Sequence, residues 1–391
     1  MNNDLVLVAS ASTPGMYIFE ALSGKQRPTP VITFTSYMGA FNFDSSLAAF
    51  VNSGSPYLNV VDTSDGTTET LTGGNPAGSA WCCQFSPDGS LLAVGHSNSP
   101  FVTVYDTSDW SKVTLSGGNP TSNGYGVSFN HDGSLLAVAG AGNPGQTVYD
   151  TSDWSKVTIT GGAVAGQCNW CEFSPDGAYL AVATNTSPTL VVYDTSDWSK
   201  ETISGTSLLS GYCLAWNPAG THVALMHSSS PFMTVFDASD WSKETLGGGG
   251  VANTGNFCSF SPDGTLLFVH TSSSPFSFYV YETSGWTVVD NPFEDYMRHI
   301  YNHKSLVMGA KTPRFIRGTV YDENGDEADR TVNVYRRSDS KLVGTTVSDA
   351  VDGTYEVELV DGDIEYDVQF QAGSGDALND LFFARVESGD T

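Results

Sequence analysis

Short apolar runs, each ended by a tight turn, recur along most of the chain. Within residues 85–110, the apolar run 91–94 follows a Ser-Pro-Asp-Gly turn, and the alternating run 102–105 follows the next turn. Runs of this length predict β-strands, which are apolar on both faces when buried and alternate when nearer to the surface. The pattern therefore predicts an all-β protein built from repeated strand–turn–strand units.

Two markers give the length of the unit. An aromatic residue before the first turn recurs at spacings of 42, 44, 44, 43 and 44 residues, and an acid after the third strand recurs at 44, 44, 44, 43 and 45. A period in the forties with several strands per unit is typical of propeller blades. The aromatic residues are Phe43, Phe85, Phe129, Phe173, Trp216 and Phe260, and the acids are Asp62, Asp106, Asp150, Asp194, Asp237 and Glu282.

The ends of the repeated region predict how the ring closes. Residues 5–20 match the second and third strands of a unit without a first strand, and residues 298–308 match a first strand. We therefore expect seven blades, the last of which combines these two segments and leaves no free sheet edge. Six or eight blades stay open, because residues 305–308 are one strand too many for a simple count.

Strand order also assigns the turns to the two faces of the propeller. The Ser-Pro-Asp-Gly turns and the Asp-Thr-Ser-Asp-Trp-Ser-Lys turns are expected on one face. The turns of the type at residues 97–100 and the glycine-rich connections between blades, such as residues 116–120, are expected on the other. Loops carry function in many scaffolds, so both faces are candidates for binding.

This unit resembles the blade of WD40-type propellers. Where that family has Trp-Asp at the end of the third strand, this chain departs from it, and the Gly-His pair before the first strand is missing. The resemblance implies a WD40-like propeller, and the two departures indicate a looser one for which that family's buried hydrogen-bond network is not assumed. The pairs at this position are Tyr105-Asp106, Tyr149-Asp150, Tyr193-Asp194 and Phe236-Asp237.

The period stops at Thr312-Pro313, which predicts two domains, residues 1–312 and 313–391. The second contains Gly-x-Val-x-Asp-x-x-Gly at 318–325, Val-x-Val at 332–334 and Ser-Asp followed by Gly-x-Tyr at 348–355. These cues resemble the carboxypeptidase-regulatory-like (transthyretin-like) β-sandwich. The ending at 377–386 resembles the C-terminal ending of such modules in tailed-phage virion proteins.

The chain is strongly acidic, with a net charge of −27. Residues 1–297 carry six basic residues against 25 acidic ones. Such a surface repels nucleic acid and anionic membranes and favours cations or basic partners. The N-terminus has no positive region followed by an apolar stretch, and no run approaches the length of a membrane span, so we expect neither ordinary export nor membrane insertion.

The six cysteines are too few for a disulfide scaffold. Cys83, Cys171 and Cys258 share one position on the first strand, where buried thiols are expected. The single Cys-x-x-Cys pair, Cys168 and Cys171, is a weak indication of zinc binding or redox chemistry without a second pair. The pair Cys82 and Cys83 has the same interpretation.

The histidines, turn acids and tryptophans each have a functional and a structural interpretation. A histidine cluster competes with a structural role for His96, His227 and His270 at the ends of second strands. His299 and His303 lie four apart, a spacing that does not converge on a strand. The paired turn acids would suit calcium but commonly bond their own backbone. The recurring tryptophans would suit sugar stacking or turn packing; they are Trp110, Trp154, Trp198, Trp241 and Trp286.

No nucleophile–base set, phosphate loop or dense metal-ligand set appears, so we predict no enzyme, no cofactor and no catalytic, cofactor or metal residue. The first hypothesis is a virion structural and adhesion protein of a tailed phage. In it the propeller presents interaction loops, and the sandwich, with Lys311, Arg314 and Arg317, docks to the particle. Its partners would be other virion proteins and a host surface glycan or protein, in a symmetric homo-oligomer.

The alternative is a WD40-like protein–protein interaction scaffold in the bacterial cytoplasm. A third alternative is a propeller lyase or lactonase, which requires a central channel lined by several acids that bind a divalent metal. Fold alone does not separate these functions, because propellers host enzymes as well as scaffolds.

Overall fold

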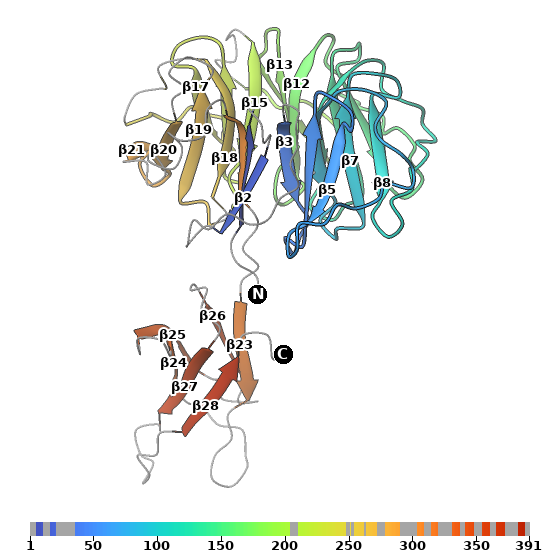
Figure 1. The fold of residues 1–391 in the computed structure, drawn as a ribbon. Coiled ribbons are helices and arrows are strands. Elements are labelled where there is room, and N and C mark those ends of the chain that lie inside the picture. The colour runs from blue at the N-terminus through green and yellow to red at the C-terminus, as the bar shows by residue number, and fades with distance from the viewer. Residues whose placement is uncertain are drawn as a thin grey trace. The chain divides into compact units, whose positions relative to one another are not determined.

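The computed structural model describes residues 5–10, 16–20, 36–203, 210–247, 251, 254–261, 263–271, 278–289, 303–308, 314–319, 331–336, 341–347, 354–359, 365–371 and 382–387, with side chains between residues 38 and 288. All regular elements in these ranges are β-strands or turns (Figure 1). The chain divides into two compact units, Leu5–Ala310 and Lys311–Thr391 with Met1–Asp4. No helix long and apolar enough to cross a membrane occurs among the described residues.

The repeated unit forms an antiparallel sheet whose three strands pair in sequence order, as the pattern predicts. The sixth of these sheets has a fourth strand, β21 (Thr287–Val289). The sheets are β3 (Ser36–Phe41), β4 (Leu47–Asn52) and β5 (Leu58–Asp62); β6 (Ala80–Phe85), β7 (Leu91–His96) and β8 (Val102–Asp106); β9 (Gly124–Phe129), β10 (Leu135–Gly140) and β11 (Gln146–Asp150); β12 (Cys168–Phe173), β13 (Tyr179–Thr184) and β14 (Leu190–Asp194); β15 (Gly211–Trp216), β16 (His222–His227) and β17 (Met233–Asp237); and β18 (Gly255–Phe260), β19 (Leu266–Thr271) and β20 (Phe278–Glu282).

A further sheet joins the two ends of the propeller. β22 (His303–Met308) pairs antiparallel with β1 (Leu5–Ser10), which pairs with β2 (Met16–Glu20). β22 contacts both β3 and β18, while the first strands of the other sheets contact their neighbours in order. The first strands therefore form a closed cycle, and the predicted use of the N-terminal strands to complete a blade is confirmed. The described strands make seven sheets in this unit.

The register corrects one marker of the repeat. Phe41 pairs with Ala48 as Phe85 pairs with Leu92, so Phe41 is the repeat aromatic residue and the spacing to Phe85 is 44. Phe43 instead occupies the turn, where it is 63% exposed. The error arose because an aromatic residue replaces the proline of the turn in this unit.

The second strand of each sheet is the most deeply buried element. In β7, five of six residues are buried, and the same pattern recurs in β4, β10, β13, β16 and β19. Runs such as Leu-Leu-Ala-Val are apolar on both faces because both faces pack against neighbouring sheets. Full burial of a leucine or valine side chain stabilises the fold by about 1.5–3 kcal/mol, so these strands are the main source of stability.

The glycine-rich connections do not lie on the face of the propeller that the strand order predicts. The backbone NH of Gly117 donates to the carbonyl of Trp154 at 2.8 Å, and the Ser116 hydroxyl donates to the carbonyl of Asp153 at 2.6 Å. Residues 116–119 therefore lie against the Asp-Thr-Ser-Asp-Trp-Ser-Lys turn of the next sheet, not on the opposite face as predicted. The same interblade contact recurs between residues 72–75 and 109–112 and between 160–162 and 197–200.

The C-terminal unit contains two antiparallel sheets. One pairs β23 (Arg314–Thr319) with β26 (Thr354–Leu359), and the other has the order β25 (Lys341–Val347), β24 (Thr331–Arg336), β27 (Glu365–Gln371) and β28 (Phe382–Glu387). The predicted strands are present, while the proposed family of this unit and the domain boundary stay predictions.

Candidate functional site

The Ser-Pro-Asp-Gly turn is held by its own side chains. The Ser86 hydroxyl donates to Asp88 Oδ1 at 2.6 Å, and the same carboxylate oxygen accepts the backbone NH of Ser90 at 3.0 Å. Gly89 has a φ of 72°, a left-handed conformation that favours glycine. The hydrogen bond from Ser86 holds the pKa of Asp88 below its ordinary value, so the carboxylate is ionised at neutral pH.

The second acidic turn is built by the same chemistry. Asp106 Oδ1 accepts the backbone NH of Ser108 at 2.9 Å and its hydroxyl at 2.6 Å. Asp109 Oδ1 accepts the backbone NH of Ser111 at 2.8 Å. The hydrogen bond from the Ser108 hydroxyl lowers the pKa of Asp106. These acids therefore accept hydrogen bonds from their own turn, as the structural interpretation predicts and in place of the calcium ligation that was its alternative.

Both acidic turns lie on one face of the propeller, as predicted. The Thr107 hydroxyl donates to the carbonyl of Gly89 at 2.7 Å and joins the two turns of one sheet. A Cβ on Gly133 would lie 3.5 Å from Pro87, so equivalent turns of neighbouring sheets are adjacent. We call this surface the acidic turn face. Its aspartates are Asp44, Asp62, Asp65, Asp88, Asp106, Asp109, Asp132, Asp150, Asp153, Asp176, Asp194, Asp197, Asp237, Asp240 and Asp263.

The tryptophans of these turns are packing residues. Trp110 and Trp198 are only 7% and 9% exposed, and Trp241 and Trp286 are buried as well. Each has a positive φ between 51° and 60° and belongs to a hydrophobic core cluster. The sugar-stacking interpretation is therefore wrong for these four rings, because their faces are covered.

The histidines at the ends of second strands do not form a cluster. His96 and His227 occupy one register position, and each Nε2 lies 2.9 Å from a threonine hydroxyl of the next strand, Thr103 or Thr234. Burial lowers the pKa of both imidazoles to about 4, so they are neutral. His270 lies one residue before this position in β19. His299 and the side chain of His303 lie outside the described residues.

All six cysteines are buried free thiols. Burial raises the pKa of Cys82 and Cys168 to about 12, so these thiols are protonated at neutral pH. Cys171 Sγ donates to the carbonyl of Gly126 at 3.9 Å. The Cys168–Cys171 pair is thus buried within the core rather than placed for metal binding, as the packing interpretation predicts.

The first strands converge on an aromatic contact. Trp170 of β12 packs edge to face on Phe257 of β18, with ring centroids 6.2 Å apart, and contacts three core clusters. Among the first strands of the seven sheets, β12 alone carries an acid, Glu172, and burial raises its pKa to about 8. Several acids around a central channel, which the lyase or lactonase hypothesis requires, are therefore absent from these strands.

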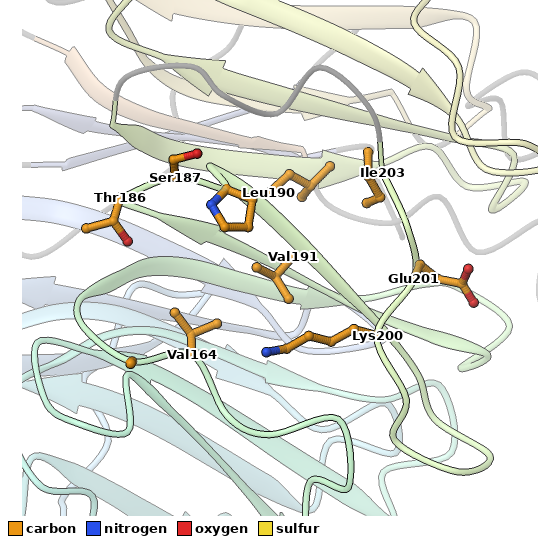
Figure 2. Close-up of a pocket in the computed structure, with 10 residues that line it drawn as sticks. Val164, Thr186, Ser187, Leu190, Val191, Lys200, Glu201 and Ile203 are labelled. Carbon is orange, nitrogen blue, oxygen red and sulfur yellow. The ribbon is translucent and has the colours of Figure 1, made fainter.

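A pocket of about 300 Å³ opens at the outer side of the β12–β14 sheet. Its lining is largely apolar and includes Val164, Pro188, Leu190 and Ile203. Figure 2 shows that Lys200 extends toward Val164, whereas Glu201 points away. The connection here reads Gly-Gly-Ala-Val, where the two preceding connections read Gly-Gly-Asn-Pro, so the pocket lies where the sequence departs from its repeat.

One group of metal-ligand side chains occurs among the described residues. A ligand atom from each of His222, Asp237 and Glu244 lies within 4.8 Å of the others. His222 Nε2 lies 3.4 Å from Glu244 Oε1, and their side chains are 23% and 31% exposed. His222 and Asp237 are cross-strand partners of β16 and β17, and the Glu244 backbone NH donates to the carbonyl of Val235.

The fold and the repeated turns define the class of this protein as a WD40-like β-propeller. The profile of the family described as eukaryotic translation initiation factor eIF2A matches residues 57–195, from β5 to β14. This match covers less than half of the chain. A search of curated proteins found no match.

Proposed function

We propose that the chain is a non-enzymatic scaffold that binds a protein partner through the acidic turn face. Asp88, Asp106 and their equivalents support this, because their short hydrogen bonds fix carboxylates at equivalent turn positions of successive sheets. A rigid array loses little conformational freedom on binding, which favours association.

The charge of this face indicates the chemistry of the partner. Lys112 and Lys156, which follow two of the turns, donate to the backbone carbonyls of Asn75 and Asn119 and not to the turn carboxylates. Complementary charge steers association and selects partners, so the proposed partner is a protein with a basic surface. The matched family is named for translation initiation. A role in the assembly of a protein complex fits that name, and an acidic surface that repels RNA favours a protein partner.

The first sequence-based hypothesis, a structural protein of a phage virion, rests on the C-terminal unit and its ending. The match to the propeller favours the scaffold, and no match concerns a virion. A location in the virion therefore stays a hypothesis, and fractionation of a lysed culture distinguishes it from the scaffold function. A virion protein would be found at fixed stoichiometry in density-purified particles, whereas a scaffold would form a soluble pool with its partner.

Isosteric neutralisation tests the proposed face. Asp109→Asn, Asp153→Asn and Asp197→Asn together remove three charges while the amide oxygen can still accept the turn NH. The control replaces Glu69 and Glu201 of the propeller and Glu356 of β26 by Gln, which removes the same number of charges outside these turn positions. Tagged chains are purified with crosslinking, and partners are quantified by mass spectrometry.

We expect a stoichiometric partner that the wild type and the control retain, that the Asn variant loses at least tenfold, and that high salt releases. Unchanged circular dichroism and melting temperature would show that the variant is folded. Equal recovery by the folded Asn variant and the wild type would refute the role of this face. Absence of any stoichiometric partner would refute the scaffold function.

A further inference from the structure

The sheet β15–β17 departs from the repeat at one register position. The first residue of the second strand is leucine in four of the six described repeats: Leu47, Leu91, Leu135 and Leu266. It is Tyr179 in β13 and His222 in β16. An apolar residue suits this half-buried edge, whereas a histidine there also offers a nitrogen ligand.

The histidine meets two acids that complete a ligand set. Its cross-strand partner is Asp237, and Glu244 lies on the outer segment of the same sheet. The equivalent position of Glu244 is Val113 in the β6–β8 sheet and Val157 in the β9–β11 sheet, each of which donates its backbone NH in the same way. The combination of imidazole and two carboxylates therefore occurs once among the described repeats.

The distances fit a small divalent ion. Two ligands of a tetrahedral zinc ion, each about 2.1 Å from the metal, lie about 3.4 Å apart. His222 Nε2 and Glu244 Oε1 are already separated by 3.4 Å, and all three ligand atoms lie within 4.8 Å of one another. A small rotation of the Asp237 side chain would complete three protein ligands and leave a position open to solvent.

Neighbouring groups orient the ligands. The Thr221 hydroxyl lies 3.0 Å from His222 Nδ1, and when it accepts the proton of Nδ1 the lone pair on Nε2 faces Glu244. Asp237 Oδ1 accepts the backbone NH of Ser239 at 2.7 Å, which leaves Oδ2 for a metal. Outer hydrogen bonds of this kind commonly fix metal-binding histidines and carboxylates.

We propose that His222, Asp237 and Glu244 bind a divalent first-row metal ion, with Zn²⁺ as its probe. The ion would link the second, third and outer segments of this sheet. His222 also packs against Trp286 of the next sheet, with ring centroids 5.3 Å apart, so the ion would stiffen the junction of two blades. Asp237 also belongs to the acidic turn face, but metal binding here does not require a partner on that face.

The test is calorimetric titration of the metal-free full chain with Zn²⁺ and, separately, Ca²⁺, together with melting curves. We expect one Zn²⁺ per chain and a rise in melting temperature of about 5 °C at a hundredfold excess over the dissociation constant. His222→Gln and Glu244→Gln should each weaken Zn²⁺ binding at least tenfold. Glu201→Gln, at the position of Glu244 in the neighbouring sheet, should bind Zn²⁺ like the wild type.

A variant that creates a second site tests the proposal without relying on loss of Zn²⁺ binding. Tyr179→His places an imidazole beside Asp194 and Glu201, at the same three register positions in the β12–β14 sheet. A folded Tyr179→His chain should bind two Zn²⁺ ions. The proposal is overturned if the wild type binds no Zn²⁺, if folded His222→Gln binds as tightly, if Ca²⁺ competes equally, or if folded Tyr179→His still binds one ion.

Discussion

Gly117 lies where the connection from one sheet crosses the turn of the next, and replacing it with alanine tests the interblade contact. A Cβ at this position would lie 2.6 Å from the backbone nitrogen of Lys156 and 3.1 Å from the carbonyl carbon of Ser155. Both are backbone atoms of a turn, so the connection must move away. The hydrogen bond from the Gly117 NH to the carbonyl of Trp154, now 2.8 Å, would lengthen.

The expected loss follows from these two effects. Forcing a methyl group into a packed site costs about 1–3 kcal/mol, and the hydrogen bond contributes about 1 kcal/mol. Gly117→Ala should therefore lower the free energy of unfolding by about 2–4 kcal/mol. At about 2 °C per kcal/mol for a domain of this size, the melting temperature should fall by about 4–8 °C.

The neighbouring glycine provides a matched control. Gly118 has a φ of 77°, but a Cβ there would have no atom within 4 Å. Gly118→Asn should cost below about 1 kcal/mol, because asparagine adopts the left-handed conformation more readily than other residues. Differential scanning calorimetry of both variants decides the question. An equal loss in the two variants, or a change below about 1 °C in Gly117→Ala, would show that the contact does not hold adjacent blades together.

Two further predictions use the titratable groups. The folded-state pKa of about 4 for His96 and His227 lies below the ordinary value of 6.5, so their stabilising effect is present above pH 6.5 and is lost as the pH falls toward 4. The residue at this position in β4 is Asn52, so both histidines can be replaced by Asn. The double variant should lose less melting temperature than the wild type between pH 6.5 and 4, and an equal loss in the two proteins would contradict the prediction. The buried thiols, such as Cys82, should resist alkylation in the native chain and react after unfolding, as counted by mass spectrometry; native modification would contradict their burial.

The fold was predictable where structure depends on local sequence. The turn at residues 86–89 is specified by Ser86, Asp88 and Gly89 within four residues, so its repetition gave the period and the blades. The same local reasoning failed at Phe43. Its aromatic side chain was taken as the marker of the repeat, although Phe43 occupies the turn position that proline has in other units. Asn42 and Ser45, with a φ of 56°, mark that turn in the structure.

Features made by distant residues could not be predicted from local sequence. The interblade contact joins Ser116 to Asp153, 37 residues apart, and depends on the path of the connection outside the sheet. The ligands His222, Asp237 and Glu244 meet only through cross-strand register and the outer segment. A signal was nevertheless present, because aligning the units in register shows histidine where most have leucine.

These departures from the repeat indicate where the particular properties of this chain lie. Residues that recur in most units, such as the turn aspartates, build a fold that many proteins use, so they cannot by themselves distinguish one function from another. The pocket at Val164, the central Trp170 and the ligand set at His222 all occur between residues 164 and 244. None of the three belongs to the repeated pattern, so they distinguish this part of the chain from the other sheets. Variants at the half-buried residues His222 and Glu244 should therefore alter binding with little effect on folding, whereas variants that break the hydrogen bonds of a turn should alter both.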